Sequence, residues 1–374
     1  MPDFDWDACD WSEAGHTVVL VGAGISADIG LPVTAELHAQ LFERLDPLYA
    51  NLAALVFAEG EPVDIERLFR VIQFLHALET SARPLDQRIS YDGLDIARLV
   101  AAWKESIENY LAAQRSVVQG SATGRLIDSL WDALFQILWI SANNPPDIRY
   151  LRWLLKSMQD GTIVTLNYDN GLEVAAIQPA AQPIDAGPYP TPPIPGLTDQ
   201  HNRVRIIKLH GSLNWITDAT TGTVTVASSD DLLTRRWVDL ISPSRPAPGI
   251  IFGAGNKLRP DGPYLDLYVE FKQALANADR FIIIGYGWGD AHVNELIRRW
   301  LQRRDKPREF RLGRLDGASL PELPRQWTYG NDSLDVHVFH GRASETIVDI
   351  TRPTPTLQRP SDLAGDLRGT ASHP

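Results

Sequence analysis

The chain has 374 residues, of which 44% are hydrophobic and 22% charged, and this length predicts one large or two medium globular domains. Its formal net charge of −12 argues against general binding to nucleic acid, because a phosphate backbone binds surfaces that are dense in Lys and Arg. The basic cluster from Arg298 to Arg308 is typical of the solvated end of a helix. We therefore expect no direct contact with nucleic acid.

Cys9 is the single cysteine, which excludes both a disulfide within the chain and a zinc site of four cysteines. Residues 1–10 are acidic and contain no Lys or Arg, so they lack the pattern of a secretory signal. The longest apolar runs, such as residues 281–284, are too short to span a membrane. These features predict a cytoplasmic protein without membrane contact.

Short runs rich in Val and Ile predict buried parallel strands, because such strands are covered on both faces and carry near-continuous apolar sequence. Helical patterns follow several of them, so we expect a doubly wound, Rossmann-like α/β sheet of about six strands. The expected strands are residues 17–21, 162–166, 204–209, 250–252, 281–284 and 335–339.

Helices are expected behind Pro32, with Thr34 as cap, and at residues 266–278 and 291–303. A further stretch, residues 35–160, is helical in pattern throughout and too long for one crossover connection. We interpret it as a helical insertion into one discontinuous domain made of residues 1–34 and 161–345. Residues 351–374 contain Pro, Ser, Thr, Gly and Asp with little apolar periodicity, and we expect residues 346–374 to form a flexible tail.

Small or polar residues follow five of the expected strands, where an open parallel sheet binds its ligands. These segments are Gly22-Ala23-Gly24-Ile25-Ser26, Asn167-Tyr168-Asp169, His210-Gly211-Ser212, Gly253-Ala254-Gly255-Asn256 and Gly285-Tyr286-Gly287-Trp288-Gly289-Asp290. Their recurrence at strand ends is more informative than any single segment, and it predicts one ligand site at this edge.

The first of these segments is the start of a G-x-G-x-x-A pattern, in which small residues let backbone amides approach a pyrophosphate. A tight turn from strand to helix would also use glycine. A dehydrogenase of the ordinary kind needs a second strand with an acidic residue about 20 residues later. The chain instead stays helical for more than a hundred residues, so a hydride-transfer enzyme is not expected.

Asn167, Asp169 and His210 are the side chains best placed for chemistry. An Asx turn that starts the next helix is the alternative explanation for Asn167 and Asp169. A histidine directly after a strand and before Gly211 lies where a general base could face a ligand, although a lone histidine is more often structural. Because Asn167 occupies an equivalent strand end, we favour a functional role for both.

The order of these motifs resembles the sirtuin family, and more closely the bacterial sirtuin-like proteins of antiphage defence that cleave NAD. The resemblance covers about residues 15–34 and 160–345. It is carried by Gly22-Ala23-Gly24-Ile25-Ser26 with Gly30-Leu31-Pro32, by Thr165-Leu166-Asn167-Tyr168-Asp169, by Leu209-His210-Gly211, and by the loop from Gly285 to Asp290 with His292 and Asn294.

The resemblance implies a role for each matching residue. Asn167 would orient the nicotinamide ribose and the attacking water, and His210 would be the general base. Asp169 would line the nicotinamide pocket. The remaining residues would bind the rest of NAD: Gly22, Ala23, Gly24 and Ser26 the pyrophosphate and adjoining ribose, and Gly285, Tyr286 and Asp290 the adenosine half.

Two departures from the sirtuin pattern argue against deacetylation. Sirtuin deacetylases carry Asp-Phe-Arg after the Gly-x-Pro, where this chain has Val33-Thr34-Ala35, and a four-cysteine zinc module that one cysteine cannot supply. We therefore expect no zinc, with NAD as substrate. The leading hypothesis is an NAD glycohydrolase that releases nicotinamide and ADP-ribose, with transfer of ADP-ribose and a non-catalytic nucleotide-binding subunit as alternatives.

Unregulated NAD hydrolysis would kill the cell that contains it, so we expect the activity to be triggered. The resemblance implies a homo-oligomer or a separate partner, such as a HerA-type ATPase or an Argonaute-type sensor, in antiviral defence. The helical insertion and the tail are the expected control surfaces.

Overall fold

The computed structural model describes most of the chain. The described residues are 16–45, 48–57, 65–80, 90–91, 94–114, 122–158, 161–177, 183–189, 203–217, 221, 223–227, 247–251, 262–315 and 321–352. Among the helices of these segments, none has the length and apolarity needed to cross a membrane.

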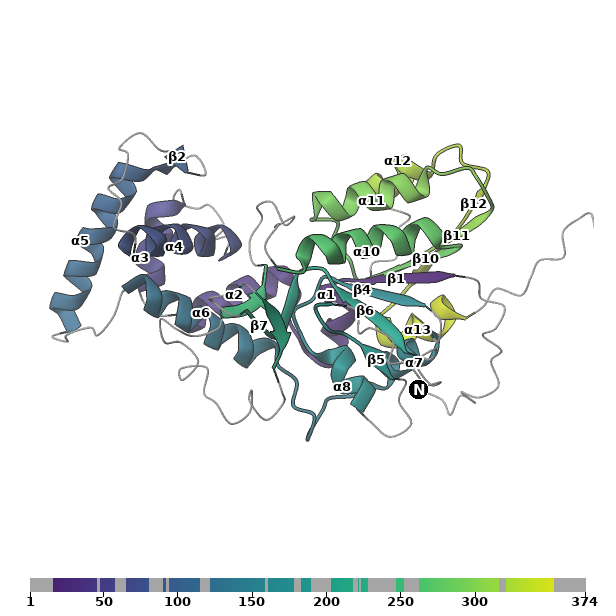
Figure 1. Cartoon of the computed structure of the whole chain (residues 1–374), viewed down its shortest axis with the longest axis horizontal. Coiled ribbons are helices and arrows are strands. Elements are labelled where there is room, and N and C mark those ends of the chain that lie inside the picture. Colours follow the sequence, from purple (N-terminus) through teal and green to yellow (C-terminus); the bar gives the residue numbers. More distant parts are fainter. Residues whose placement is uncertain are drawn as a thin grey trace, which may run out of the picture.

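The described strands include a seven-stranded parallel sheet, in the right half of Figure 1, with the order β12-β11-β10-β1-β4-β6-β5. Its strands are β1 (Thr17–Val21), β4 (Thr162–Thr165), β5 (Ile184–Asp185), β6 (Val204–Lys208), β10 (Arg280–Ile284), β11 (Arg308–Arg314) and β12 (Leu334–His340). After β1, the chain first forms β4, β5 and β6 on one side of β1 and then β10, β11 and β12 on the other side. The strand order therefore reverses between β1 and β10, which is where such sheets bind ligands.

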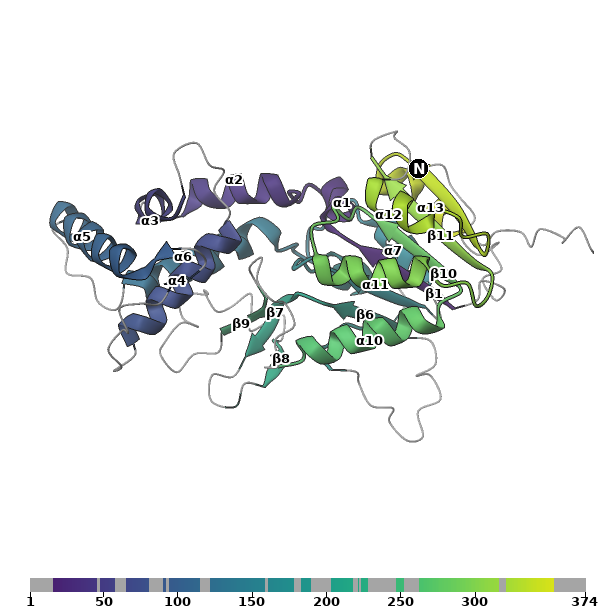
Figure 2. The same ribbon diagram turned by 90° about the horizontal axis from the view of Figure 1, so that it is seen from above.

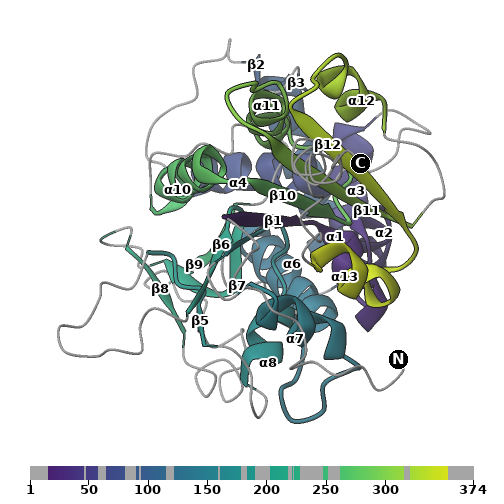
Figure 3. The same cartoon turned by 90° about the vertical axis from the view of Figure 1, so that its right-hand side faces the viewer.

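Successive residues of the central strands face opposite sides of the sheet, as the pleat requires. Val19 and Val21 of β1 pack into the core under α7 (Arg149–Lys156), α8 (Gly171–Ile177) and α13 (Ala343–Thr351). Val18 and Leu20 pack into the other core, under α10 (Tyr264–Asn277) and α11 (Ala291–Leu301) (Figure 3). Covered faces on both sides confirm the predicted doubly wound fold.

Between β1 and β4 the chain forms a group of helices that extends to one side of the sheet (Figures 1 and 2). They are α2 (Thr34–Arg44), α3 (Leu48–Val56), α4 (Ile65–Thr80), α5 (Ile96–Gln114) and α6 (Ala122–Leu138). They share a hydrophobic core in which Trp103 and Trp131 are buried, and Tyr168, Leu213 and Ile250 from outside these helices also belong to it. A short hairpin, β2 (Ser90–Tyr91) and β3 (Leu94–Asp95), precedes α5. The domain boundaries expected from the sequence stay a prediction.

Three expectations about individual elements were wrong. A parallel strand was expected at 250–252, but Ile250 ends β9 (Ala247–Ile250), which pairs antiparallel with β7 (Gly211–Thr217). β7 also pairs with β8 (Val224–Val226), and residue 252 lies outside the described segments. An apolar run indicates burial but not strand direction. Thr34 does not cap α2, because Val33 precedes the helix and donates its N–H to Glu36.

The expected ligand-binding segment at residues 253–256 lies outside the described part of the chain, so it stays a prediction.

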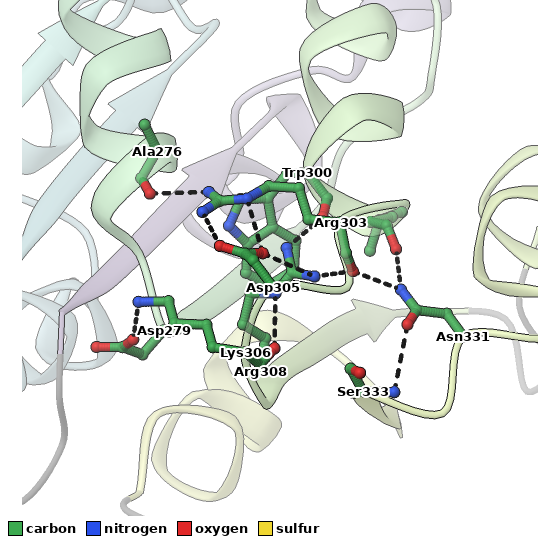
Figure 4. Close-up of polar contacts among 10 residues, drawn as sticks. Ala276, Asp279, Trp300, Arg303, Asp305, Lys306, Arg308, Asn331 and Ser333 are labelled. Atoms are coloured by element: carbon green, nitrogen blue, oxygen red, sulfur yellow. Dashed lines mark hydrogen bonds and ion pairs between the residues drawn. The ribbon is translucent and has the colours of Figure 1, made fainter.

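The basic cluster was expected to be solvated, but Arg308 is buried at the start of β11 (Figure 4). Its guanidinium donates to the carbonyl oxygens of Trp300, at 2.7 Å, and Arg303, and it stacks over the Trp300 ring. Asn331 donates to the carbonyl oxygens of Leu301 and Arg303 at 2.7 and 2.9 Å. These bonds satisfy carbonyl groups that the end of α11 leaves without helical partners, and they fix this helix to β11.

We predict that Asn331→Ala lowers the free energy of unfolding by about 1–3 kcal/mol, because the buried Leu301 carbonyl loses the Asn331 donor and the Arg303 carbonyl keeps only that of Arg308. Chemical denaturation followed by circular dichroism measures this change. Lys104→Gln, on an exposed position of α5, is the control and should change stability by less than about 0.5 kcal/mol. Equal stability of the two variants would show that the Asn331 bonds do not hold α11 in place.

Candidate functional site

One cavity of about 630 Å³ lies at the carboxyl edge of the sheet, in the size range of small-molecule sites, roughly 300–1,000 Å³. Val21 is in register with both Thr165 and Ile284, and Thr165 with Lys208, so the loops after four strands begin at one level. This alignment brings together all the residues predicted for the site, since each lines the cavity: Gly22, Ala23, Gly24, Ser26, Asn167, Asp169, His210, Gly285, Tyr286 and Asp290.

The glycines of the first and last loops interlock. A Cβ on Gly24 would lie 2.6 Å from the Gly285 Cα, and a Cβ on Gly22 would lie 2.6 Å from the Gly285 oxygen. Gly24 donates its N–H to Gly285 at 3.0 Å, and Gly285 itself has a φ of 65°. Close packing between the β1 and β10 loops thus requires glycine at these positions, in addition to the predicted approach of a phosphate group.

A chain of hydrogen bonds orients the polar side chains beside the first loop. The Asn167 carboxamide donates to the Gly22 oxygen at 3.1 Å and to the Ser26 hydroxyl at 3.0 Å. The Ser26 hydroxyl in turn donates to Asp169 at 2.9 Å. Because both contacts use the Asn167 nitrogen, the planar amide directs its oxygen away from them. The sequence predicted these residues for one site but not the bonds that join them.

Asp169 both forms an Asx turn and lines the cavity, which were the two explanations considered for it. One carboxylate oxygen accepts the Gly171 N–H at 2.9 Å, which is an Asx turn before α8, and the other accepts from Ser26. Below it lies Lys208, a fully buried residue of β6 that donates to the Asp169 carbonyl at 2.7 Å and pairs with Glu173 at 2.6 Å. Lys208 was not predicted from the sequence, although a cation directly after the apolar pair Ile206 and Ile207 was the available signal.

His210 is buried and contacts Asp290, which comes from the loop after β10. The distance from His210 Nε2 to Asp290 Oδ2 is 3.0 Å. Asp290 also caps α11, because its other oxygen accepts the N–H groups of His292 and Val293. The Tyr168 ring lies on a neighbouring loop, with its centroid 6.2 Å from that of His210. The sequence placed Asp290 near the adenosine half of the ligand and did not predict its contact with His210.

Tyr286 supports the last loop from within. Its hydroxyl accepts the Asp290 N–H at 3.1 Å and donates to Asn294 at 2.9 Å. Burial raises the pKa of this phenol above its ordinary value, so Tyr286 stays protonated at neutral pH. Trp288 in the same loop has a φ of 61°, a conformation that costs energy outside glycine and is often found at functional sites.

The helical segment after β1 covers part of the cavity, which the sequence analysis did not foresee. Leu37 and His38 of α2 line it, as does Leu138 at the end of α6. No Lys or Arg is among the described residues that line the cavity. The acidic groups Asp169 and Asp290 thus share this lining with His38 and His210, which are its basic side chains among the described residues.

Residues 161–322 match the SIR2-like domain. This segment contains both Asn167 and His210. No curated protein matches the chain. Solved structures resemble it at low identity. They include a Sir2 homolog–NAD complex (15% identity, 91% of this chain and 90% of that chain, TM-score 0.40). Sir2 bound to an acetylated peptide is also similar (12%, 91% and 93%, TM-score 0.41).

We predict that Gly285→Ala destabilises the protein by about 1–3 kcal/mol, because a side chain at its φ of 65° is strained and the new Cβ would meet the Ile25 nitrogen at 2.5 Å. Thermal unfolding measures the loss. Gly287→Ala is the matched control in the same loop, since a Cβ there meets nothing within 4 Å. If both variants unfold at the wild-type temperature, the two loops do not depend on each other.

Proposed function

We propose that this protein is an NAD glycohydrolase, which cleaves the bond between nicotinamide and ribose. The observation that carries the proposal is that Asn167 and His210 line one cavity with the Gly22–Ser26 loop, at the point where the strand order reverses. The match of residues 161–322 to the SIR2-like domain supports it independently. NAD would lie with its pyrophosphate toward the Gly22–Ser26 loop and its nicotinamide ribose toward Asn167.

The charges around the cavity suit cleavage of NAD. The nicotinamide ring is a cationic leaving group and needs no acid to protonate it, while the ribose gains positive charge as the bond breaks. Asp169 lines the cavity with its carboxylate held by Ser26 and Gly171, so its negative charge is fixed before the reaction. Preorganised charge of this kind stabilises a transition state without the cost of reorganising solvent.

The proposed reaction is a hydrolysis. The oxygen of a water molecule forms a bond to the anomeric carbon, and the bond from that carbon to the nicotinamide nitrogen breaks with both electrons passing to the ring. Neutral nicotinamide leaves, and His210 accepts the proton of the water. Asn167, whose amide is held by Gly22 and Ser26, orients the ribose and the water. General base catalysis of this kind contributes about 10²–10⁴-fold.

The residues after the Gly-x-Pro motif argue against deacetylation. Val33, Thr34 and Ala35 replace the Asp-Phe-Arg of sirtuin deacetylases, and here they lead directly into α2. All three line the cavity. With one cysteine in the chain, the zinc module of those enzymes cannot form.

We further propose that the helical segment controls the site and that a trigger releases the activity. Tyr168, which lies between Asn167 and Asp169, is part of the hydrophobic core of the helical segment. Asn170 exchanges two hydrogen bonds with Ile140, which follows α6, at 2.8 and 2.9 Å. A shift of these helices would therefore move the loop that carries Asn167. A homo-oligomer or a partner such as a HerA-type ATPase or an Argonaute-type sensor would provide the trigger, as part of antiphage defence in the cytoplasm.

The proposal predicts that the activated protein releases nicotinamide from NAD and that Asn167→Ala and His210→Ala each reduce release by at least about 100-fold. Chromatography measures the free nicotinamide, and a label in the adenine of NAD follows the ADP-ribose. Lys104→Gln is the control and should act as the wild type.

The label also separates the alternatives. Label that stays on protein or nucleic acid would indicate transfer of ADP-ribose. Calorimetry tests the other alternative, because binding of NAD without turnover under all conditions would indicate a nucleotide-binding subunit. Release that is unchanged in both variants would contradict the site assignment.

A further inference from the structure

His210 and Asp290 form a buried pair from two separate loops. They are 80 residues apart in sequence, and their side chains are 8% and 6% exposed. His210 follows β6, whereas Asp290 is the residue before α11. A hydrogen bond between a carboxylate and a ring nitrogen is stronger when water is excluded, as it is for both partners here. The pair is thus fixed by the fold and does not depend on a ligand.

We infer that Asp290 is a positioning residue that sets the orientation and the tautomer of His210, an inference that rests on the proposed function. An ionised carboxylate only accepts hydrogen bonds, so the ring nitrogen that faces it must carry a proton. His210 therefore holds its proton on Nε2 in the neutral state, and Nδ1 is the basic nitrogen. Asp290 would act through His210 instead of binding the adenosine half of NAD.

The carboxylate of Asp290 is itself held rigidly. Its Oδ1 accepts the His292 and Val293 N–H groups at 2.9 and 3.1 Å, so its Oδ2 is turned toward His210. The partial positive charge at the start of α11 favours the ionised form. Val293 and Trp300 of α11 are buried in the core beside the sheet, which ties the position of the carboxylate to the body of the fold.

This arrangement has a consequence for catalysis. When His210 accepts a proton from water it becomes a cation, and the adjacent carboxylate stabilises that cation. Without the carboxylate the ring could turn or move its proton to Nδ1, and the base would be lost. Asp290 should therefore affect the chemical step more than the binding of NAD.

The cap and the contact with His210 can be separated by substitution. Asn caps a helix about as well as Asp, so Asp290→Asn retains the bonds to His292 and Val293. Its amide nitrogen then faces His210 Nε2 and requires that atom to accept, which moves the proton to Nδ1. Asp290→Ser also caps the helix, but its shorter side chain does not reach His210.

We expect Asp290→Asn to lower kcat by roughly 10²–10⁴-fold, with little change in KM and an unchanged melting temperature. Asp290→Ser should lower kcat in the same direction. Glu295→Gln, further along α11 and half-exposed, is the control and should keep the wild-type kcat. A purely structural cap would predict wild-type kcat in both capped variants.

Nitrogen-15 NMR of labelled histidine gives a readout that does not need activity. The His210 signal, assigned with His210→Gln, should show a protonated Nε2 in the wild type and a protonated Nδ1 in Asp290→Asn. The same tautomer in both proteins, or a wild-type kcat in Asp290→Asn, would overturn the inference. Absence of nicotinamide release from the wild type would instead contradict the proposed function, and the NMR comparison would still decide whether Asp290 sets the tautomer.

Discussion

The site depends on the contact between the loops after β1 and β10, in which backbone packs directly on backbone. Gly22, Gly24 and Gly285 allow this approach because no Cβ lies between the two loops. The Gly24 N–H donates to the Gly285 carbonyl, and Tyr150 of α7 donates to the Ile25 carbonyl at 2.5 Å from below. The first loop is thus fixed from two sides. Asn167 and Ser26 then take their positions from this loop, through hydrogen bonds to Gly22 and to each other.

From this contact the polar groups spread in two directions along the sheet edge. On the β4 side, Ser26 and Asp169 continue the network down to the buried Lys208. On the β10 side, Tyr286 holds the backbone of Asp290, which reaches His210 after β6. Each direction contains a buried charged group with a partner, which is Glu173 for Lys208 and His210 for Asp290, as the cost of burying a charge requires. The edge of the sheet therefore carries a preorganised set of polar side chains.

The sequence predicted the centre of the fold because its signals there are local. Fully buried strands such as β1 and β10 are continuous apolar runs, and the polar residues after them mark the edge of the sheet. β11 was missed because Arg308, Glu309 and Arg311 interrupt its apolar pattern. In the structure these charges are tolerated because Glu309 forms ion pairs with Arg311 and with Arg280 of the neighbouring strand β10. A pairing between neighbouring strands leaves no trace in the spacing along one strand.

The same limit applies to the site. Asn167 and His210 could be singled out because each directly follows a strand, but the bond from His210 to Asp290 joins loops that are distant in sequence. The cover formed by α2 and Leu138 depends on how a whole group of helices packs on the sheet, which helical periodicity does not specify. The sequence could therefore identify the site residues but not the contacts between them.

The most direct test of the account is a crystal structure with a non-hydrolysable NAD analogue whose nicotinamide ribose is replaced by a carbocycle. The account predicts that the analogue occupies the cavity with its pyrophosphate at the Gly22–Ser26 loop and the nicotinamide-bearing ring between Asn167 and His210. An analogue bound elsewhere, or bound here with its adenine beside Asn167 and His210, would contradict it.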